Sequence, residues 1–205
     1  ASHAALRTLS IRVMEVLGTL GRTLACGEMD QIEVSHGEII DEKAYFNVIR
    51  QKTASLFIAC MHIGALTSGM SPEQTSAVKG FGERLGLCFQ IKDDIFDYFA
   101  AGEIGKPTRS DLSEGKVTLP LIYALTHTEG SRCAEMKSLV AKPELSEDEI
   151  SRLVAFAVEN GGIEYAEKVM EQLRDEARRY LEPFFPSPAA ESLMSVFDYT
   201  ISRAK

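Results

Sequence analysis

The chain has 205 residues, of which 45% are hydrophobic and 25% are charged, and its formal net charge is −8. This length and balance predict one soluble folding unit over residues 1–205, and no apolar run is long enough to cross a bilayer. The excess of acidic residues and the lack of a basic run argue against nucleic-acid binding, so we expect metal ions or cationic partners instead.

The chain opens with ASHAALRTLSIRVMEVLG, which has no initiator methionine and already lies inside an amphipathic pattern, so we expect a fragment. Helical periodicity continues almost everywhere, without strand alternation or repeats. The sequence therefore predicts an all-α fold. The expected helices cover residues 3–34, 42–69, 73–101, 117–139, 146–159, 161–181 and 187–203.

Two helix starts carry local signals. Ser71 precedes Pro72 in a first turn, and Ser146 with Glu149 matches a capping box. Between the helices, residues 102–116 form a long glycine-rich connection, and loops of that length are often functional. Its basic residues are Lys106, Arg109 and Lys116.

The four cysteines have no C-x-x-C spacing and lie in or beside apolar helical runs. This favours reduced core thiols in a cytoplasmic protein over a disulfide or zinc site. The cysteines are Cys26, Cys60, Cys88 and Cys133.

Three aspartates interrupt an otherwise apolar helix. At helical spacing, Asp93, Asp94 and Asp97 share one stripe with Gln90. We expect this helix to be buried, with its acidic stripe facing an internal polar cavity. The opposite side carries Phe81, Leu85, Cys88, Ile91, Ile95 and Phe99.

Carboxylates that are buried together repel one another unless a cation lies between them. Oxygen ligands without His or Cys suit Mg²⁺, completed by water and by substrate phosphates. The alternative for an isolated D-D-x-x-D pattern is a solvated acidic face.

Polar groups also interrupt two earlier helices. Lys52 is the only charge on the stripe Tyr45, Ile49, Lys52, Leu56, Ala59, Ile63, while Glu28 and Gln31 continue an apolar stripe. Structural alternatives are a snorkelling lysine and a helix that emerges into solvent near Gly27. Carboxylates together with lysines suggest a pyrophosphate held through metal. The segment GEIGKPT fits a nucleotide phosphate loop poorly, because its glycine spacing is wrong and it follows a helix.

Four segments in order resemble motifs of the polyprenyl (trans-isoprenyl) diphosphate synthase family. ACGEMDQ resembles its Gly-Glu-x-x-Gln motif, YFNVIRQKTASLF its Lys-Thr motif, FQIKDDIFDYF its second aspartate-rich motif, and GKPTRSDLSEGKVTLP the segment that follows. The resemblance implies an isoprenoid synthase fold, a bundle of antiparallel helices around a central cavity, and commonly a homodimer.

The resemblance also implies a reaction in which Mg²⁺ assists departure of an allylic diphosphate and isopentenyl diphosphate attacks the allylic cation. By position, it assigns Mg²⁺ and the allylic diphosphate to Asp93, Asp94 and Asp97. It assigns diphosphate contacts to Lys52, Lys106 and Lys116, and places Thr53 and Gln90 beside the reacting centre.

The family's first aspartate-rich motif has no counterpart here, since Asp30 and Asp41 are the only aspartates in residues 1–92. Either the N-terminal third was removed, cleaved or left out, or the chain is a natural accessory subunit. We expect the 205-residue chain alone to be inactive as a synthase.

Other functions remain as alternatives. A class I terpene cyclase would share the aspartate-rich metal site, a non-catalytic subunit would dimerise with a complete synthase, and a helical scaffold would leave the acidic stripe solvated. Lys52 and the EGKVTLP segment favour the synthase. By resemblance, KTASLF and GEMDQ favour a longer-chain product such as the octaprenyl type.

Overall fold

A computed structural model describes residues 10–35, 41–99 and 110–203 of the chain. Within these ranges it consists of helices and connecting turns, without a strand, which confirms the all-α prediction. The chain divides into two compact units. Unit 1 comprises Ala1–Met29, Val48–Gln90 and Gln172–Arg203, and unit 2 comprises Asp30–Asn47, Ile91–Glu171 and Ala204–Lys205. That residues 1–205 form one domain stays a prediction.

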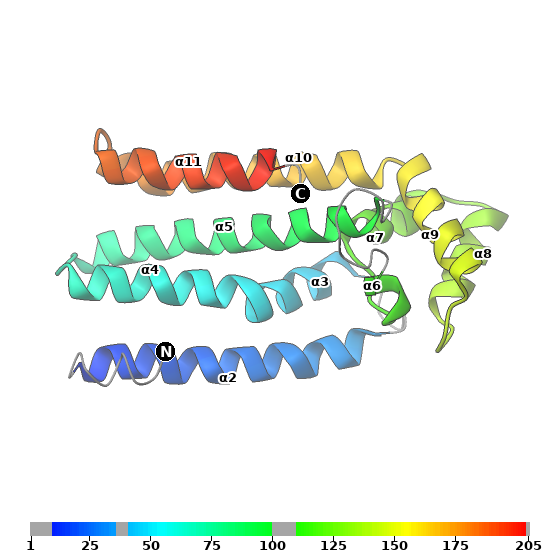
Figure 1. The fold of residues 1–205 in the computed structure, drawn as a ribbon, viewed down its shortest axis with the longest axis horizontal. Helices are drawn as coiled ribbons and strands as arrows, with labels where there is room; N and C mark the ends of the chain where they lie inside the picture. The colour runs from blue at the N-terminus through cyan, green and yellow to red at the C-terminus, as the bar shows by residue number, and fades with distance from the viewer. Residues whose placement is uncertain (1–9, 36–40, 100–109, 204–205) are drawn as a thin grey trace. The chain divides into compact units, whose positions relative to one another are not determined.

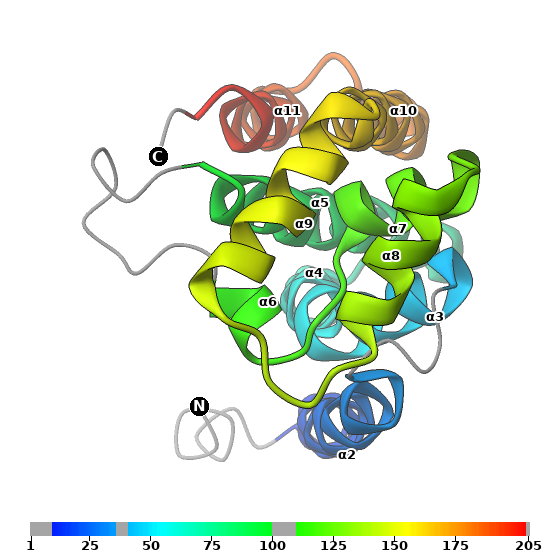
Figure 2. The ribbon, with the colours of Figure 1, turned by 90° about the vertical axis from the view of Figure 1, so that its right-hand side faces the viewer.

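Unit 1 is built from long helices with nearly parallel axes, seen lengthwise in Figure 1 and end-on in Figure 2. Its core includes the fully buried rings of Phe81 and Phe197, which meet edge to face with centroids 6.0 Å apart. The elements are α2 (Ile11–Val34) as far as Met29, the π-helix η2 (Arg50–Ala54), α4 (Ser55–Thr67), α5 (Pro72–Asp97) as far as Gln90, the end of α10 (Gly162–Leu181), the 3₁₀ turn η3 (Glu182–Phe184) and α11 (Pro188–Ser202).

Unit 2 contains the shorter helices, in which α7 packs against α8 and α9 (Figure 2). Leu119, Leu125 and Leu153 are fully buried there. Its elements are the end of α2, α3 (Glu42–Ile49) as far as Asn47, the end of α5, α6 (Ser110–Ser113), α7 (Leu119–His127), α8 (Ser131–Val140), α9 (Glu147–Glu159) and the start of α10.

The predicted helix starts are confirmed. Helix α5 begins at Pro72, and the Ser71 hydroxyl accepts a hydrogen bond from the main chain of Gln74 at 3.2 Å. The Ser146 side chain accepts a hydrogen bond from the main-chain N–H of Glu149, and the Glu149 side chain accepts one from the main-chain N–H of Ser146. Together the two bonds complete the capping box.

The expectation of one helix over 117–139 is wrong. Helix α7 ends at His127 and α8 begins at Ser131, with Gly130 at φ +100 between them. This backbone conformation favours glycine, because a side chain there would be strained. The polar stretch around Gly130 therefore separates two helices that periodicity alone had joined.

The cysteine expectation is half right. None of the four, all within the described residues, is in a disulfide, and Cys88 and Cys133 are buried, but Cys26 and Cys60 are exposed. The prediction that all four are core thiols is therefore wrong for Cys26 and Cys60.

The apolar side of α5 is buried as expected, with Phe81, Cys88 and Ile91 each 0% exposed. Phe99 is 43% exposed, contrary to prediction, because α5 ends at Asp97 and helical spacing no longer applies beyond it. Among the described residues, no helix has both the length and the apolarity of a membrane span.

Candidate active site

Lys52 and Thr53 lie in a π-helical turn. The segment Arg50–Ala54 forms η2 between α3 and α4, where a uniform α-helix was expected. A π turn adds one residue per turn, rotates the following side chains, and often occurs at functional sites. Beyond this turn the predicted stripe holds only in part: Ala59 is buried as expected, whereas Leu56 is 51% exposed.

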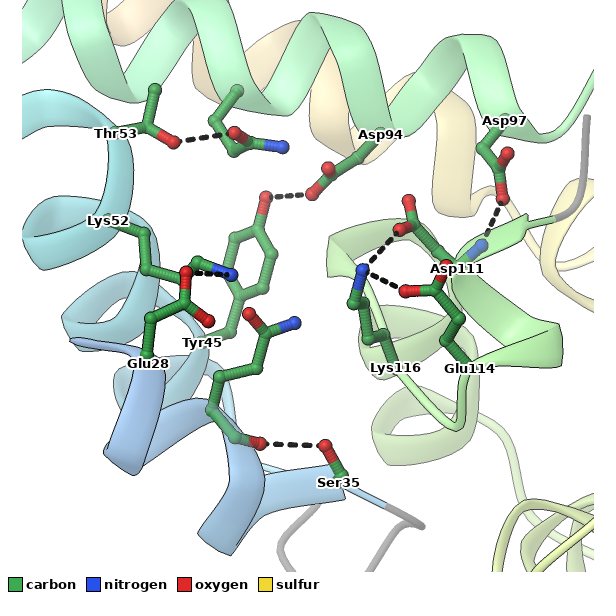
Figure 3. A network of polar contacts seen from close by, with 12 residues as sticks. Glu28, Ser35, Tyr45, Lys52, Thr53, Asp94, Asp97, Asp111, Glu114 and Lys116 are labelled. Carbon is green, nitrogen blue, oxygen red and sulfur yellow. Dashed lines mark hydrogen bonds and ion pairs between the residues drawn. The ribbon is translucent and has the colours of Figure 1, made fainter. Parts of the chain in front are cut away.

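Gly27 allows α2 to approach this π turn closely. A Cβ atom at Gly27 would lie 2.8 Å from Cβ of Gln51 and 3.0 Å from Cγ of Lys52. One residue further along α2, Oε1 of Glu28 lies 3.1 Å from Nζ of Lys52 (Figure 3). The ammonium of Lys52 is therefore balanced by a carboxylate within unit 1. The Glu28 side chain is 65% exposed, as the alternative of a helix emerging into solvent predicts.

Thr53 and Gln90 are hydrogen-bonded to each other. The Thr53 hydroxyl donates to Oε1 of Gln90 at 2.6 Å. Close helix packing supports this contact, because a Cβ at Gly86 would lie only 2.5 Å from Cα of Ala54. The two residues that the resemblance placed beside the reacting centre are thus brought together in unit 1.

Asp94 is the buried member of the acidic stripe, with 3% of its surface exposed. The hydroxyl of Tyr45, also buried at 7%, donates to Oδ2 of Asp94 over 2.6 Å (Figure 3). Burial, followed by the negative charge of Asp94, raises the pKa of Tyr45 well above its ordinary value. The phenol therefore keeps its proton and remains a donor to the carboxylate.

Asp97 contacts the short helix α6. Its Oδ2 accepts a hydrogen bond from the main-chain N–H of Asp111 at 3.1 Å. Burial, followed by the charge of Asp97, raises the pKa of Asp111, against the opposing effect of Lys116. The Asp111 carboxylate therefore lies in a setting that disfavours its negative charge.

Lys116 lies beside the same group in unit 2. Its Nζ is 2.5 Å from Glu114 Oε2 and 3.4 Å from Asp111 Oδ1 (Figure 3). Burial alone would lower the pKa of Lys116, but its hydrogen bonds and charge interactions with these two acids raise it. The side chain thus stays positively charged close to the carboxylate that neighbours Asp97.

The remaining predicted residues are less defined. Asp93 is half-buried. Lys106 and Arg109 lie outside the described residues.

The groove of about 530 Å³ in unit 1 is lined by α2, η2, α4 and α5, including Arg12, His62 and Lys79. None of the predicted site residues lines that groove.

The carboxylates of unit 2 fit a magnesium ion held by few protein ligands. No three His, Cys, Asp or Glu side chains within the described ranges lie close enough together to hold a metal. However, the raised pKa of Asp111 beside Asp97 marks a position where a cation would relieve both repulsion and burial. Mg²⁺ commonly uses one or two carboxylates, with water and phosphate oxygens completing its shell.

Sequence reasoning missed Tyr45 and Asp111. Tyr45 was counted only as part of an apolar stripe, although a phenol on a buried helix face usually needs a polar partner. Asp111 lies within the segment GKPTRSDLSEGKVTLP, but no spacing rule linked it to Asp97. In the fold, Asp97 and Asp111 are hydrogen-bonded to each other although they are 14 residues apart in sequence.

The sequence model of the family described as polyprenyl synthetase matches residues 1–157. The chain belongs to this family. Over 198 residues it is 30% identical to an octaprenyl diphosphate synthase of Escherichia coli K12, a match that covers 95% of this chain and 60% of that relative.

Solved structures of the polyprenyl synthetase family share its fold. A geranylgeranyl pyrophosphate synthase from Bacteroides thetaiotaomicron is 39% identical with a TM-score of 0.88, over 97% of this chain and 66% of that one. A Caulobacter crescentus polyprenyl synthase, solved with calcium and isoprenyl diphosphate, is 30% identical with a TM-score of 0.89, over 98% and 61%. The predicted isoprenoid synthase fold class is thereby confirmed.

Proposed function

We propose that this chain is the diphosphate-binding part of a trans-polyprenyl diphosphate synthase. Such a prenyltransferase condenses an allylic diphosphate with isopentenyl diphosphate to a longer polyprenyl diphosphate. The observation that carries the proposal is the polyprenyl synthetase match over residues 1–157, which includes every residue of the candidate site. The same match favours this function over a class I terpene cyclase.

The acidic stripe of unit 2 is assigned to the metal-bound diphosphate. In this proposal Asp93, Asp94 and Asp97 bind the Mg²⁺ of the diphosphate, with one or two carboxylates on any one ion. The raised pKa of Asp111 beside Asp97 supports a cation at that end of the stripe. When bound, Mg²⁺ would neutralise the charge that develops on the departing diphosphate. The calcium and isoprenyl diphosphate complex of the Caulobacter relative supports a divalent ion as cofactor.

The proposed cationic contacts are Lys52, Lys106 and Lys116. Lys52 and Lys116 are each held by a carboxylate, from Glu28 and Glu114 respectively. A diphosphate would replace a partly exposed acid as the partner of each ammonium, so each lysine has its charge positioned before substrate binds. Lys106 rests on the resemblance of the GKPTRSDLSEGK segment.

Thr53 and Gln90 are proposed to lie beside the reacting carbon. The bond from the Thr53 hydroxyl to Oε1 of Gln90 fixes the amide orientation. A fixed dipole costs no reorganisation when charge develops, which is how such a pair stabilises a transition state.

Beyond this core, we propose a cytoplasmic homodimer that makes a longer-chain product. The exposed thiols of Cys26 and Cys60 support a reducing compartment. The octaprenyl relative supports a longer prenyl product, whereas the geranylgeranyl relative supports a shorter one. Chromatography of the product made by an active synthase that carries these residues decides between the two lengths. Size-exclusion chromatography with light scattering tests the dimer.

The chain spans 60% of the length of the octaprenyl relative, and residues 1–92 hold no second aspartate pair. We therefore propose that the 205-residue chain binds a diphosphate group but does not elongate an allylic diphosphate. An accessory subunit would share this property. Polyprenyl product formed by the purified chain with Mg²⁺, isopentenyl diphosphate and an allylic diphosphate would overturn this.

The direct test of the site is thermal unfolding with Mg²⁺ and inorganic diphosphate together. A ligand that binds only the folded state stabilises it by mass action, by about 2.7 kcal/mol at 100 times its Kd. We expect a raised Tm that EDTA reverses and that Asp93→Asn removes. The exposed Asp175→Asn is the matched control. An unchanged Tm of the wild-type chain supports the solvated-scaffold alternative and contradicts the site.

A further inference from the structure

We propose that Tyr45 is a positioning residue that orients the Asp94 carboxylate toward the metal-bound diphosphate. The inference rests on the proposed function and adds a residue that neither the motif resemblance nor helical spacing assigned. Tyr45 lies on α3 and Asp94 on α5, 49 residues apart in sequence but both in unit 2. Their contact is a buried hydrogen bond of 2.6 Å.

The contact restricts what Asp94 can do. An ionised carboxylate offers two oxygens and can bind a cation through either or both. The hydrogen bond from the Tyr45 hydroxyl to Oδ2 restricts rotation of the Asp94 carboxylate and occupies one of that oxygen's two lone pairs. Partners of ligating carboxylates fix ligand orientation in this way, and their loss typically lowers metal affinity about 10- to 100-fold.

Helix α3 is itself tethered at its first residue, Glu42, which lies on the same face as Tyr45. Glu42, one turn before Tyr45, accepts from the hydroxyl of Tyr165 on α10, with oxygen distances of 2.9 and 3.0 Å. The ring of Tyr45 also packs edge to face against Phe46, with centroids 5.4 Å apart. The phenol that holds Asp94 is therefore anchored through its own helix, which a positioning role requires.

A second buried tyrosine provides a matched control. Tyr98 is 6% exposed, close to the 7% of Tyr45, and its hydroxyl is 2.9 Å from that of Thr118. Both Tyr45→Phe and Tyr98→Phe remove one buried hydroxyl, but only the first removes a donor to an acidic-stripe carboxylate. A purely structural role predicts similar effects of both substitutions.

The experiment measures the affinity for inorganic diphosphate at saturating Mg²⁺ by titration calorimetry on the 205-residue chain. We expect Tyr45→Phe to weaken binding about tenfold or more. Tyr98→Phe should change it less than about twofold, because the Tyr98 hydroxyl is hydrogen-bonded to Thr118 and not to a ligating carboxylate. Equal affinities of wild type and Tyr45→Phe would overturn the inference while leaving the proposed function intact. A wild-type chain that binds no diphosphate would overturn both.

A double substitution covers the case in which Tyr45→Phe fails to fold because it removes a hydrogen bond from the buried charge of Asp94. Asp94→Asn removes that charge, so Tyr45→Phe is then compared with wild-type Tyr45 in the Asp94→Asn background. If Tyr45 acts through Asp94, the two chains bind diphosphate equally. A further loss of affinity in the double variant would show that Tyr45 acts independently of Asp94 and would overturn the inference.

Discussion

The hydroxyl of Tyr165 lies within hydrogen-bond distance of both carboxylate oxygens of Glu42, at 2.9 and 3.0 Å, although the two residues are 123 apart in sequence. The ring of Tyr165 also stacks on Tyr123, with centroids 4.2 Å apart. Within unit 2, the side chain of Tyr165 thus joins α10 to both α3 and α7.

Tyr165→Phe keeps the ring stacking and loses the hydrogen bond to Glu42. Because a partly exposed hydrogen bond to a charged group is worth little more than a neutral one, we expect a loss of about 1 kcal/mol in the free energy of unfolding. Urea denaturation near neutral pH measures it. The exposed Tyr199→Phe is the control and should leave the free energy unchanged, since Tyr199 is 68% exposed.

The same pair predicts a pH dependence. Burial, followed by the hydrogen bond to Glu42, raises the pKa of Tyr165 to about 12. Because the pKa is raised in the folded state, the Tyr165 hydroxyl contributes fully to the free energy of unfolding below its ordinary pKa near 10, and this contribution is lost as pH rises through the folded-state value. The stability difference between wild type and Tyr165→Phe should therefore shrink as pH rises from about 10 toward 12. A difference that stays constant over that range contradicts the assignment.

Gly27→Ala should destabilise unit 1, because its Cβ would lie 2.8 Å from that of Gln51. Overpacking of this kind typically costs about 1–3 kcal/mol. Gly18→Ala and Gly21→Ala on the same helix meet nothing within 4 Å, so they should raise stability by up to about 1 kcal/mol through helix propensity. Opposite signs in urea denaturation are the expected result; the same sign for all three would refute the close approach.

Glu149 gives a prediction at acidic pH. Its hydrogen bond with Lys142, followed by that with the Ser146 main chain, lowers its pKa to about 2. Because the pKa is lowered, the Glu149 carboxylate contributes fully to the free energy of unfolding above its ordinary pKa of 4.5, and this contribution is lost as pH falls toward 2. Glu149→Gln keeps a capping side chain without the charge. The stability gap between the two proteins should close over this range and narrow in high salt, because the pair is exposed.

Lys52→Ala tests the proposed diphosphate contact. Charge-assisted hydrogen bonds are worth about 1.5–3 kcal/mol, which corresponds to roughly a tenfold to hundredfold loss in affinity for Mg²⁺-diphosphate by calorimetry. Stability should fall by less than about 1 kcal/mol, since the ion pair with Glu28 is partly exposed. Lys43→Ala, at an exposed position on α3, is the control that should leave affinity unchanged.

Local patterns in the chain were sufficient for the all-α class, for most of the helices and for the position of the acidic stripe, although they joined α7 and α8 into one helix. Periodicity identified the buried side of α5, and two capping signals marked the starts of α5 and α9 correctly. Such features depend on residues within a turn or two of one another, so spacing alone reveals them. The π turn at Arg50–Ala54 escaped notice, because inserting one residue per turn leaves no mark in composition.

Which partner each polar side chain has was decided only by the tertiary structure. The sequence placed Lys52, Thr53, Gln90 and the aspartates on their helices, but the fold paired Thr53 with Gln90 and Tyr45 with Asp94, 37 and 49 residues apart. The first pair requires α5 to approach η2 closely, as Gly86 allows. Helical spacing fixes the direction of a side chain from its own helix, whereas its hydrogen-bond partner depends on which other helix packs there.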